Sequence, residues 1–351
     1  MAVYVDGQKV GTVIINEDKT AYNNLVTRNI TKLTTDDFEG ITEIGPYAFA
    51  GCANLTSAEI PASVTTIGNN AFDLCSNLTN IIVGSTTINS SAFYNCSNLT
   101  NVTLLEGVET LGSYCFYNTG LTTLILPTSV IEMGYDCFWN VENLSIYYNG
   151  SVNQFIEIGK LTPLGSNRGN TFDLYVNNQK VTSVTISPND NFSFYACSNM
   201  SIESATIDTN TSSYMFQECL NLTTINFGTS IYSINNYTFY RCSSLQQINI
   251  PSNITSIDGS AFSNCTNLQQ VTYEGQAPNI LQDVFRNDNA VTKYDFRNCI
   301  TIPTLYSTTS LGHASGCQII VPDALYDEWI VATNWVALTD VNFVKASEYV
   351  E

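Results

Sequence analysis

Cysteine is the residue type in this sequence with the widest range of possible chemistry, because a thiolate can attack a substrate, bind a metal ion or form a disulfide. The 351 residues contain 11 cysteines, and most of them lie three positions after a phenylalanine. No Cys-x-x-Cys pair is present, so neither a zinc site nor a redox pair is indicated. Phe296 and Cys299 show the same three-residue spacing as seven earlier copies of Phe-x-x-Cys. Those copies begin at Phe49, Phe72, Phe93, Phe194, Phe216, Phe239 and Phe262.

A cysteine or serine nucleophile needs a base, and the sequence offers a single histidine, His313. Cys317 follows it closely, but Gly312, Ala314 and Gly316 indicate a turn in this stretch. Nothing nearby supplies the third group that orients the base of a nucleophile pair. We therefore expect no catalytic residues here.

Carboxylates are numerous but scattered along the chain. A glycan hydrolase needs two of them in one cleft, and the positions predicted to line the sheet are mostly Asn, Thr and Gln. Calcium would need more ligands than the turn Asn287-Asp288-Asn289 provides. Phosphate-loop, dinucleotide-binding and zinc-protease motifs do not occur either. The sequence thus predicts no enzyme, no cofactor and no metal, with a glycan hydrolase as a remote alternative.

The elements that carry these residues are arranged with a fixed period. From Phe49 the next phenylalanines follow at steps of 23, 21, 23 and 22 residues, and from Phe194 at steps of 22, 23, 23 and 23. A repeat in the low twenties is typical of a solenoid, in which successive coils of backbone stack on one another. The regular cysteine is then best interpreted as a small apolar side chain that packs beside the phenylalanines. Cys115 and Cys137, which stand where other coils have alanine, favour the same interpretation.

Each period contains one short alternating run that predicts a strand. In Leu99-Thr100-Asn101-Val102-Thr103-Leu104, the period of two places Val102 and Leu104 inside and Asn101 and Thr103 outside. Proline then ends several of these runs, as at Pro61, because it cannot donate to a continuing ladder.

The stretch Ile60-Pro61-Ala62-Ser63-Val64-Thr65-Thr66-Ile67-Gly68-Asn69-Asn70-Ala71-Phe72 resembles the BspA-like, or Treponema-type, leucine-rich repeat family. The resemblance covers about residues 41 to 148 and 181 to 300. It implies a mainly β solenoid that serves adhesion or protein binding in bacterial surface proteins, with relatives in gut-bacterial and phage-borne proteins. The fold expected is a leucine-rich-repeat solenoid of ~22–23-residue coils, interrupted once, with a C-terminal helical cap.

Two similar segments, called leads below because each precedes a set of coils, divide the chain. Tyr4-Val5-Asp6-Gly7 and Tyr175-Val176-Asn177-Asn178 each open a predicted hairpin before a set of coils. Val152 to Leu161 predicts a short helix in the interruption, and Pro322 with acidic residues after it predicts a helix start. The predicted divisions are 1–40 as an N-terminal hairpin lead, 41–148 as the first repeat array, 149–174 as an irregular interruption, 175–300 as a second lead and array, and 301–351 as a cap.

The charge balance limits the classes of partner that this chain can bind. With 31 acidic and 12 basic residues the formal charge is −19, which would repel nucleic acid. Such a diffuse charge is typical of a solvated surface, and an acidic patch for a basic partner is the alternative. No signal peptide and no apolar run long enough to span a membrane is visible, so no membrane insertion is expected. The expected location is extracellular, at the cell surface, or on a virion.

Two sets of residues are candidates for ligand binding. Amide and hydroxyl groups on the outward side of the strands could bind a protein or glycan, although they could also serve only to keep the sheet soluble. Aromatic side chains after the repeated phenylalanine could grip a ligand, although such ladders also stabilise solenoids internally. The function expected is a non-enzymatic binding or adhesion scaffold, with a structural or receptor-binding component of a phage virion or tail as the alternative. The candidates are Asn80, Asn101, Thr103, Thr123, Thr224, Asn226, Gln247 and Asn249 on the strands, and Tyr94, Tyr117 and Trp139 after the phenylalanines.

Overall fold

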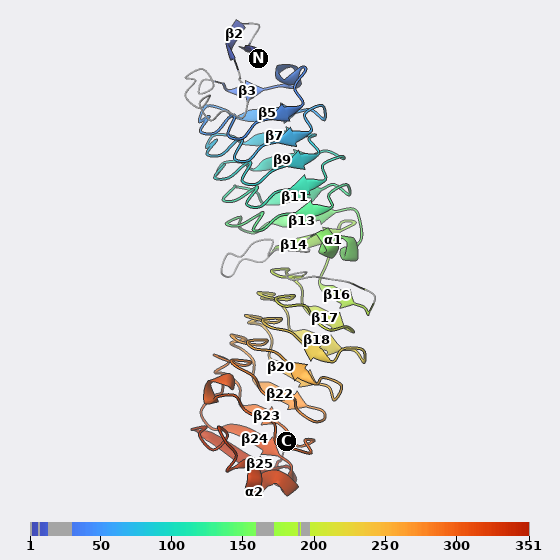
Figure 1. The fold of residues 1–351 in the computed structure, drawn as a ribbon, viewed down its shortest axis with the longest axis vertical. Coiled ribbons are helices and arrows are strands. Elements are labelled where there is room, and N and C mark those ends of the chain that lie inside the picture. Colours follow the sequence, from blue (N-terminus) through green and yellow to red (C-terminus); the bar gives the residue numbers. More distant parts are fainter. Residues whose placement is uncertain are drawn as a thin grey trace. The chain divides into compact units, whose positions relative to one another are not determined.

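The computed structural model shows a mainly β chain in which short strands of successive coils stack in parallel, as Figure 1 shows. It divides into two compact units, Met1–Lys180 and Val181–Glu351, called unit 1 and unit 2 below and described separately. The structure describes residues 2–5, 8–12, 30–158, 172–188, 190 and 197–350.

Unit 1 contains two sheets whose strands alternate along the chain. The longer sheet has the order β15-β14-β13-β11-β9-β7-β5-β3, and the shorter has the order β12-β10-β8-β6-β4. All neighbours in both sheets are parallel except β14 and β15, which form an antiparallel hairpin. The longer sheet consists of β3 (Lys32–Leu33), β5 (Ser57–Ile60), β7 (Asn80–Val83), β9 (Asn101–Leu104), β11 (Thr123–Leu126), β13 (Ser145–Tyr148), β14 (Asp173–Val176) and β15 (Gln179–Lys180). The shorter sheet consists of β4 (Glu43–Ile44), β6 (Thr66–Ile67), β8 (Thr87–Ile88), β10 (Thr110–Leu111) and β12 (Glu132–Met133).

Four further elements belong to unit 1. The strands β1 (Ala2–Val5) and β2 (Gln8–Thr12) pair as an antiparallel hairpin at the predicted first lead, whose turn residues Asp6 and Gly7 lie outside the described residues. A 3₁₀ helix, η3, spans Thr35–Phe38. The predicted helix of the interruption is α1 (Val152–Ile158), which buries Phe155, Ile156 and Ile158, while the predicted end at Leu161 falls outside the described residues.

Unit 2 repeats the design and then adds strands at its C-terminal end. A three-stranded sheet has the order β16-β17-β18, and a five-stranded sheet has the order β20-β22-β23-β24-β25, all parallel. These strands are β16 (Ser183–Ile186), β17 (Ser204–Ile207), β18 (Thr224–Phe227), β20 (Gln247–Ile250), β22 (Gln270–Tyr273), β23 (Lys293–Asp295), β24 (Cys317–Val321) and β25 (Val341–Lys345). The pair β19 (Ser233–Ile234) and β21 (Ser256–Ile257), the helix α2 (Tyr326–Trp329) and the 3₁₀ helices η4 (Thr308–Ser310), η5 (Asp323–Leu325) and η6 (Ala346–Glu348) complete it.

The register stacks equivalent positions of neighbouring coils. Ile81 of β7 pairs with Val102 of β9, and both side chains are buried. The repeated phenylalanines therefore form a ladder inside each unit: Phe72 and Phe93 have ring centroids 5.3 Å apart, and Phe239 and Phe262 have centroids 5.1 Å apart. Near-parallel, offset rings at this spacing are favourable, and each ring also buries a large apolar area.

The cysteines pack against this ladder, as the sequence predicts. All 11 are buried free thiols. The thiol of Cys96 donates to the carbonyl oxygen of Phe72 at 3.1 Å, so it fills space and also satisfies a buried acceptor. Cys115 occupies the alanine position, since the N–H of Phe93 donates to its carbonyl as the N–H of Phe72 donates to that of Ala92.

In the coils that the structure describes, left-handed residues stand two positions before and two positions after the phenylalanine of the ladder, and they bend the coil around it. The second position is Asn95 in the coil of Phe93, with φ 56°, and Asn118 in the coil of Phe116, with φ 53°. Asparagine tolerates this conformation better than most residues, because its short side chain can hydrogen-bond locally. Here the amides also bond between coils: Asn118 Nδ2 donates to Asn95 Oδ1 at 2.9 Å.

Phe296 and Cys299 repeat the spacing of the Phe-x-x-Cys turns, but they do not form another such turn around the ladder. Phe296 directly follows β23 and stacks on Tyr273, the last residue of β22, with centroids 4.8 Å apart. The coil of Phe285 supplies the next corner, and it carries Asp288 at the position of the thiol. The spacing of three residues recurs there by coincidence, because the strand register decides which ladder a ring joins.

The predicted cap contains the helix α2, but it also extends the sheet. Trp329 and Trp335 are buried, and both rings have centroids 5.4 Å from that of Phe296. Val336, the residue after Trp335, is 60% exposed. The strands β24 and β25 in this segment were not predicted. The five-part division of the chain therefore stays a prediction.

Candidate binding surfaces

The outward rows of the strands hold the predicted polar side chains in solvent. Along β9 the burial alternates, so that Asn101 and Thr103 are exposed while Val102 and Leu104 are buried. The other six candidates on the strands are exposed as well: Asn80, Thr123, Thr224, Asn226, Gln247 and Asn249.

The row in unit 1 is partly apolar. Ile125 of β11 is 65% exposed, and Tyr147 of β13 stacks on Tyr175 of β14 with ring centroids 4.6 Å apart. These side chains interrupt the polar row. The candidates of unit 1, Asn80, Asn101, Thr103 and Thr123, lie on the neighbouring strands β7, β9 and β11.

In unit 2 the row widens into a polar groove of about 450 Å³. Gln247 and Gln270 pair across β20 and β22, so their side chains leave the sheet on the same side. The residues just before these strands add a second row of amides. We call this surface the glutamine groove; it is lined by Thr223, Gln246, Gln247, Gln269 and Gln270.

The chemistry of the glutamine groove is that of the primary amide. Each side chain presents two donor hydrogens and one acceptor oxygen, and no charged residue lines the groove. Within the part of the chain that the structure describes, none of the four glutamine side chains has a hydrogen-bond partner, so these groups are available to a ligand. Gln246 and Gln269 were not predicted, although the repeated Leu-Gln-Gln of consecutive coils is a visible signal.

The aromatic candidates lie together on the edge where the chain turns around the phenylalanine ladder. Tyr94 and Tyr117 stack with centroids 4.2 Å apart, and Trp139 is tilted against Tyr117 at 6.4 Å. Two rings that were not predicted complete the group, namely Tyr114 and Tyr135, whose centroids are 5.6 Å apart. We call this surface the aromatic edge; it consists of Tyr94, Tyr114, Tyr117, Tyr135 and Trp139, all at least partly exposed.

The equivalent edge of unit 2 already holds a cation. Tyr214 stacks on Tyr237 with centroids 4.9 Å apart, and the guanidinium of Arg241 lies 5.8 Å from the ring centre of Tyr240. Arg241 also forms a 3.1 Å ion pair with the buried carboxylate of Glu218. Tyr195, which follows Phe194, lies outside the described residues.

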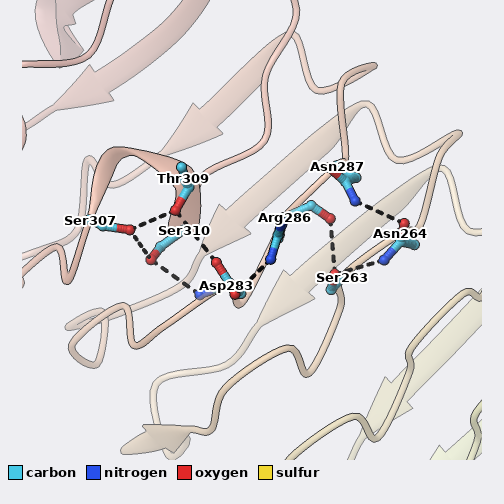
Figure 2. Close-up of polar contacts among 8 residues, drawn as sticks. All are labelled: Ser263, Asn264, Asp283, Arg286, Asn287, Ser307, Thr309 and Ser310. Carbon is cyan, nitrogen blue, oxygen red and sulfur yellow. Dashed lines mark hydrogen bonds and ion pairs between the residues drawn. The ribbon is translucent and has the colours of Figure 1, made fainter.

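Near the C-terminal end of unit 2, a network of hydrogen bonds connects residues of neighbouring coils, as Figure 2 shows. Asp283 accepts from Arg286 at 3.2 Å and from the hydroxyl of Thr309 at 3.5 Å, and its own N–H donates to Ser310 Oγ. On the other side Ser263 Oγ donates to the carbonyl of Arg286 at 3.0 Å. The carboxylate that could act as a base beside these hydroxyls is therefore engaged with an arginine, and the network ties neighbouring coils together.

His313 and Cys317 do not form a pair. His313 Nδ1 lies 3.2 Å from the carbonyl oxygen of Ala314, and the Cys317 thiol is directed at the carbonyl of Gln318. Burial raises the pKa of Cys317 to about 12, so its thiolate is disfavoured at neutral pH.

Asp288, the acid of the considered calcium turn, is buried inside the coil. Neither carboxylate oxygen has a hydrogen-bond partner, and Asn287 Nδ2 donates to Asn264 Oδ1 instead of facing a common ion site. Burial raises the pKa of Asp288 to about 8, against the opposing effect of the nearby backbone N–H groups of Cys265 and Asn264. Over the described ranges, no three His, Cys, Asp or Glu side chains gather as they would around a metal ion.

No helix among the described residues is both long and apolar enough to cross a membrane.

The fold is shared with a solved bacterial structure. The pneumococcal vaccine antigen PcpA is similar over 90% of this chain and 79% of its own, with a TM-score of 0.58 and 16% identity. A leucine-rich repeat protein from Bacteroides ovatus aligns over 87% of each chain, with a TM-score of 0.45 and 20% identity. No curated protein sequence matches the chain.

The repeat itself is recognised at the sequence level. A profile of the BspA type leucine-rich repeat region matches residues 18–145 and 172–292 in six copies. These ranges span more than half of the chain and contain the phenylalanine and thiol ladders of both units. The chain therefore belongs to the BspA type leucine-rich repeat family.

Proposed function

We propose that this protein is a non-enzymatic binding module whose glutamine groove holds a neutral glycan. The observation that carries the proposal is a set of four glutamine amides that have no hydrogen-bond partner among the described residues. Two of them are in register on β20 and β22, and two directly precede those strands. Sugar hydroxyl groups both donate and accept hydrogen bonds, and a primary amide can do the same, so the two match without any charge. The exposed Thr224, Asn226 and Asn249 extend the polar surface on either side of the groove.

The composition of the groove favours a glycan over a protein ligand. The residues that dominate the energy of protein interfaces are Trp, Tyr and Arg, which pack into desolvated pockets. None of these lines the glutamine groove. A carboxylated or sulfated glycan is disfavoured as well, because no Lys or Arg is present there to pair with it.

A glycan array that includes neutral and anionic oligosaccharides tests the proposal, followed by calorimetric titration of the best neutral binder. The double variant Gln247→Ala with Gln270→Ala removes two paired amides, and we expect its affinity to fall by about tenfold or more, since each lost hydrogen bond contributes about 0.5–1.5 kcal/mol. The matched control is Gln217→Ala with Gln282→Ala, which removes two glutamines from the turn edge of the same unit and should leave the affinity within about twofold. Unchanged affinity in the groove variant, or a preference for anionic glycans, would refute the assignment.

The absence of catalysis is part of the proposal and is tested on the same ligand. Incubation with the bound oligosaccharide should leave its length unchanged. Turnover that a single carboxylate substitution abolishes would overturn the binding role in favour of a hydrolase.

We also propose that the protein acts outside the cytoplasm, at a cell surface or on a virion. The likeness to PcpA, a vaccine antigen, supports an exposed location. Antibody labelling of intact cells and of purified particles from the source culture separates the two sites, and labelling only after lysis would contradict both.

A further inference from the structure

The glutamine groove of unit 2 is longer across the strands than along them. Its lining residues come from three successive coils, one from the first and two from each of the others. The two from one coil are neighbours in the chain, so they span only about 3.3 Å along the strand. The strands β20 and β22 pair in register, which places the two glutamine coils about 4.8 Å apart, and the coil of Thr223 adds a further step. A ligand that fills the groove therefore runs from coil to coil, across the strands.

Gln246 and Gln269 replace a residue that neighbouring coils use for stacking. The coils on either side have threonine at this position, just before the strand. Thr223 Oγ1 donates to the carbonyl of Glu203 at 3.0 Å, and Thr292 Oγ1 donates to the carbonyl of Gln269 at 3.3 Å. In the two glutamine coils the hydroxyl is replaced by a longer, exposed amide with no hydrogen-bond partner among the described residues. Since threonine suffices for stacking, the two amides indicate a role in binding.

The strand ladder is interrupted at one end of the groove. β18 is the last strand of one sheet and β20 is the first strand of the next, so the two are not paired. The backbone N–H of Gln269 donates to the carbonyl of Gln246 at 2.7 Å, whereas among the described residues no such bond joins Gln246 to Thr223. The groove thus has space beside Thr223 in addition to its two glutamine coils. Its volume of about 450 Å³ lies within the usual range of about 300–1,000 Å³ for small-molecule sites.

Charged residues bound the groove at both ends. Beyond Gln270 the next residue in register is Lys293, whose ammonium group lies 5.6 Å from the ring centre of Tyr349. Beyond Thr223 the equivalent residue one coil earlier is Glu203, an exposed carboxylate. The neutral polar surface is therefore three coils long.

We propose that the ligand of the glutamine groove is an extended, β-1,4-linked glycan that lies across the strands with three consecutive sugars in contact. The inference rests on the proposed function, which assigns a neutral glycan to this groove. A β-1,4 linkage joins equatorial positions of successive pyranose rings, so the chain is straight and advances by about one coil spacing per sugar. An α-1,4-linked chain winds into a helix and leaves a straight row of coils after one or two sugars.

The groove offers such a chain a separate set of contacts for each sugar. Each glutamine coil provides two amides, and each amide can both donate to and accept from sugar hydroxyls. The third sugar occupies the space beside Thr223, where the ladder is open.

Calorimetric titration of the full chain with cellohexaose and with maltohexaose tests the linkage. Both are neutral hexamers of glucose, so they differ in shape and not in charge or composition. We expect cellohexaose to bind more tightly by about tenfold or more, because the curved chain loses the hydrogen bonds of at least one coil.

A series from cellobiose to cellohexaose tests the length of the site. The binding enthalpy should grow from cellobiose to cellotriose and then stay nearly constant, because only three sugars contact the protein. Enthalpy is the suitable readout because a longer chain can bind in several registers, which raises its affinity without adding any contact.

Single substitutions measure the contribution of each coil. Gln246→Thr and Gln269→Thr introduce the residue that the neighbouring coils carry, so both variants should fold. Each should weaken cellotriose binding by about fivefold or more, since a sugar loses its amide partner. The matched control is Gln217→Thr, the same change on the turn edge of the same unit, and its affinity should stay within about twofold of that of the unaltered chain.

The outcomes separate this inference from the proposed function. Tighter binding of maltohexaose than of cellohexaose, weakened by Gln246→Thr, would overturn the extended chain and leave the neutral-glycan role standing. An enthalpy that keeps growing from cellotriose to cellohexaose would overturn the three-sugar site, and an equal loss of affinity in Gln217→Thr would overturn its placement in the groove. Absence of binding by every neutral oligosaccharide would contradict the proposed function and this inference with it.

Discussion

Replacing Asp288 by cysteine should stabilise the protein, and the gain should grow as the pH rises. Asp288 takes the place in its coil that Cys265 takes in the preceding one, and it is fully buried. Both of its oxygens lack hydrogen-bond partners. The titratable groups closest to it, Cys265 and Tyr294, are neutral there because burial raises the pKa of each. No cation among the described residues pairs with the carboxylate.

The magnitude follows from proton linkage. Burial raises the pKa of Asp288 in the folded chain to about 8 from an ordinary value of 3.8. Below pH 3.8 the carboxyl is protonated in both states and imposes no penalty. Between the two values the unfolded chain has lost the proton while the folded chain keeps it, so stability falls as pH rises, by about 1.4 kcal/mol per pH unit. The penalty at pH 7 is then about 4 kcal/mol, and it levels off above pH 8.

Urea unfolding of the parent and of Asp288→Cys at pH 5, 6, 7 and 8 measures this difference. We expect the advantage of the variant to increase by several kcal/mol from pH 5 to pH 8. The matched control is Asp323→Asn. Hydrogen bonds from Ser347 lower the pKa of Asp323, so this carboxylate is ionised in both states throughout the range and its variant should show no such trend. A difference between parent and Asp288→Cys that is the same at pH 5 and pH 8 would refute the reasoning.

Three further predictions concern the ladders. Adding a reducing agent should leave Tm nearly unchanged because all 11 thiols are free, and a drop of ten degrees or more on differential scanning calorimetry would contradict this. Phe93→Ala should cost about 3–5 kcal/mol in urea unfolding, because Phe93 is fully buried between Phe72 and Phe116; a loss below about 1 kcal/mol would mean that the ring is not packed as described. Asn118→Ala should cost about 1–2 kcal/mol, because alanine at φ 53° is strained and cannot bond to Asn95, and Asn118→Gly should recover part of the loss; equal stability of the two variants would argue against the strain.

The fold could be predicted from the sequence because the repeat shows both the length of a coil and which residues of each strand face the interior. The alternation of Asn101, Val102, Thr103 and Leu104 fixed which side of β9 is buried, and the structure confirms it. The thiol positions were also interpretable, since Cys interchanges with Ala at Cys115 without disturbing the coil. Such patterns are visible in the sequence because the same local packing recurs in every coil.

Spacing without register left the surroundings of two residues undetermined. Phe296 and Cys299 share a three-residue spacing with the corners, yet Phe296 directly follows β23, so it joins the ring of Tyr273. Asp288 was considered only as a ligand in the turn Asn287-Asp288-Asn289, whereas its place three residues after Phe285 puts it inside the coil.

The candidate surfaces were predictable only in part. Gln247 follows from the strand alternation, but Gln246 precedes the strand, where the period of two no longer determines direction. Tyr114 joins the aromatic edge from a left-handed position two residues before Phe116. Tyrosine recurs at this position as Tyr47, Tyr214 and Tyr237, which is a repeat signal that the strand alternation does not show. Ligand chemistry therefore had to be argued from the surfaces that the coils assemble.

The buried thiols have a consequence for handling and secretion. In an oxidising medium the native coils shield every sulfur, but a molecule that unfolds there exposes 11 of them together. Random cross-linking would then compete with restacking, so heat damage that is reversible with dithiothreitol present should become permanent in air. Folding before oxidant is encountered thus protects this chain in a way that a disulfide-stapled secreted domain does not require.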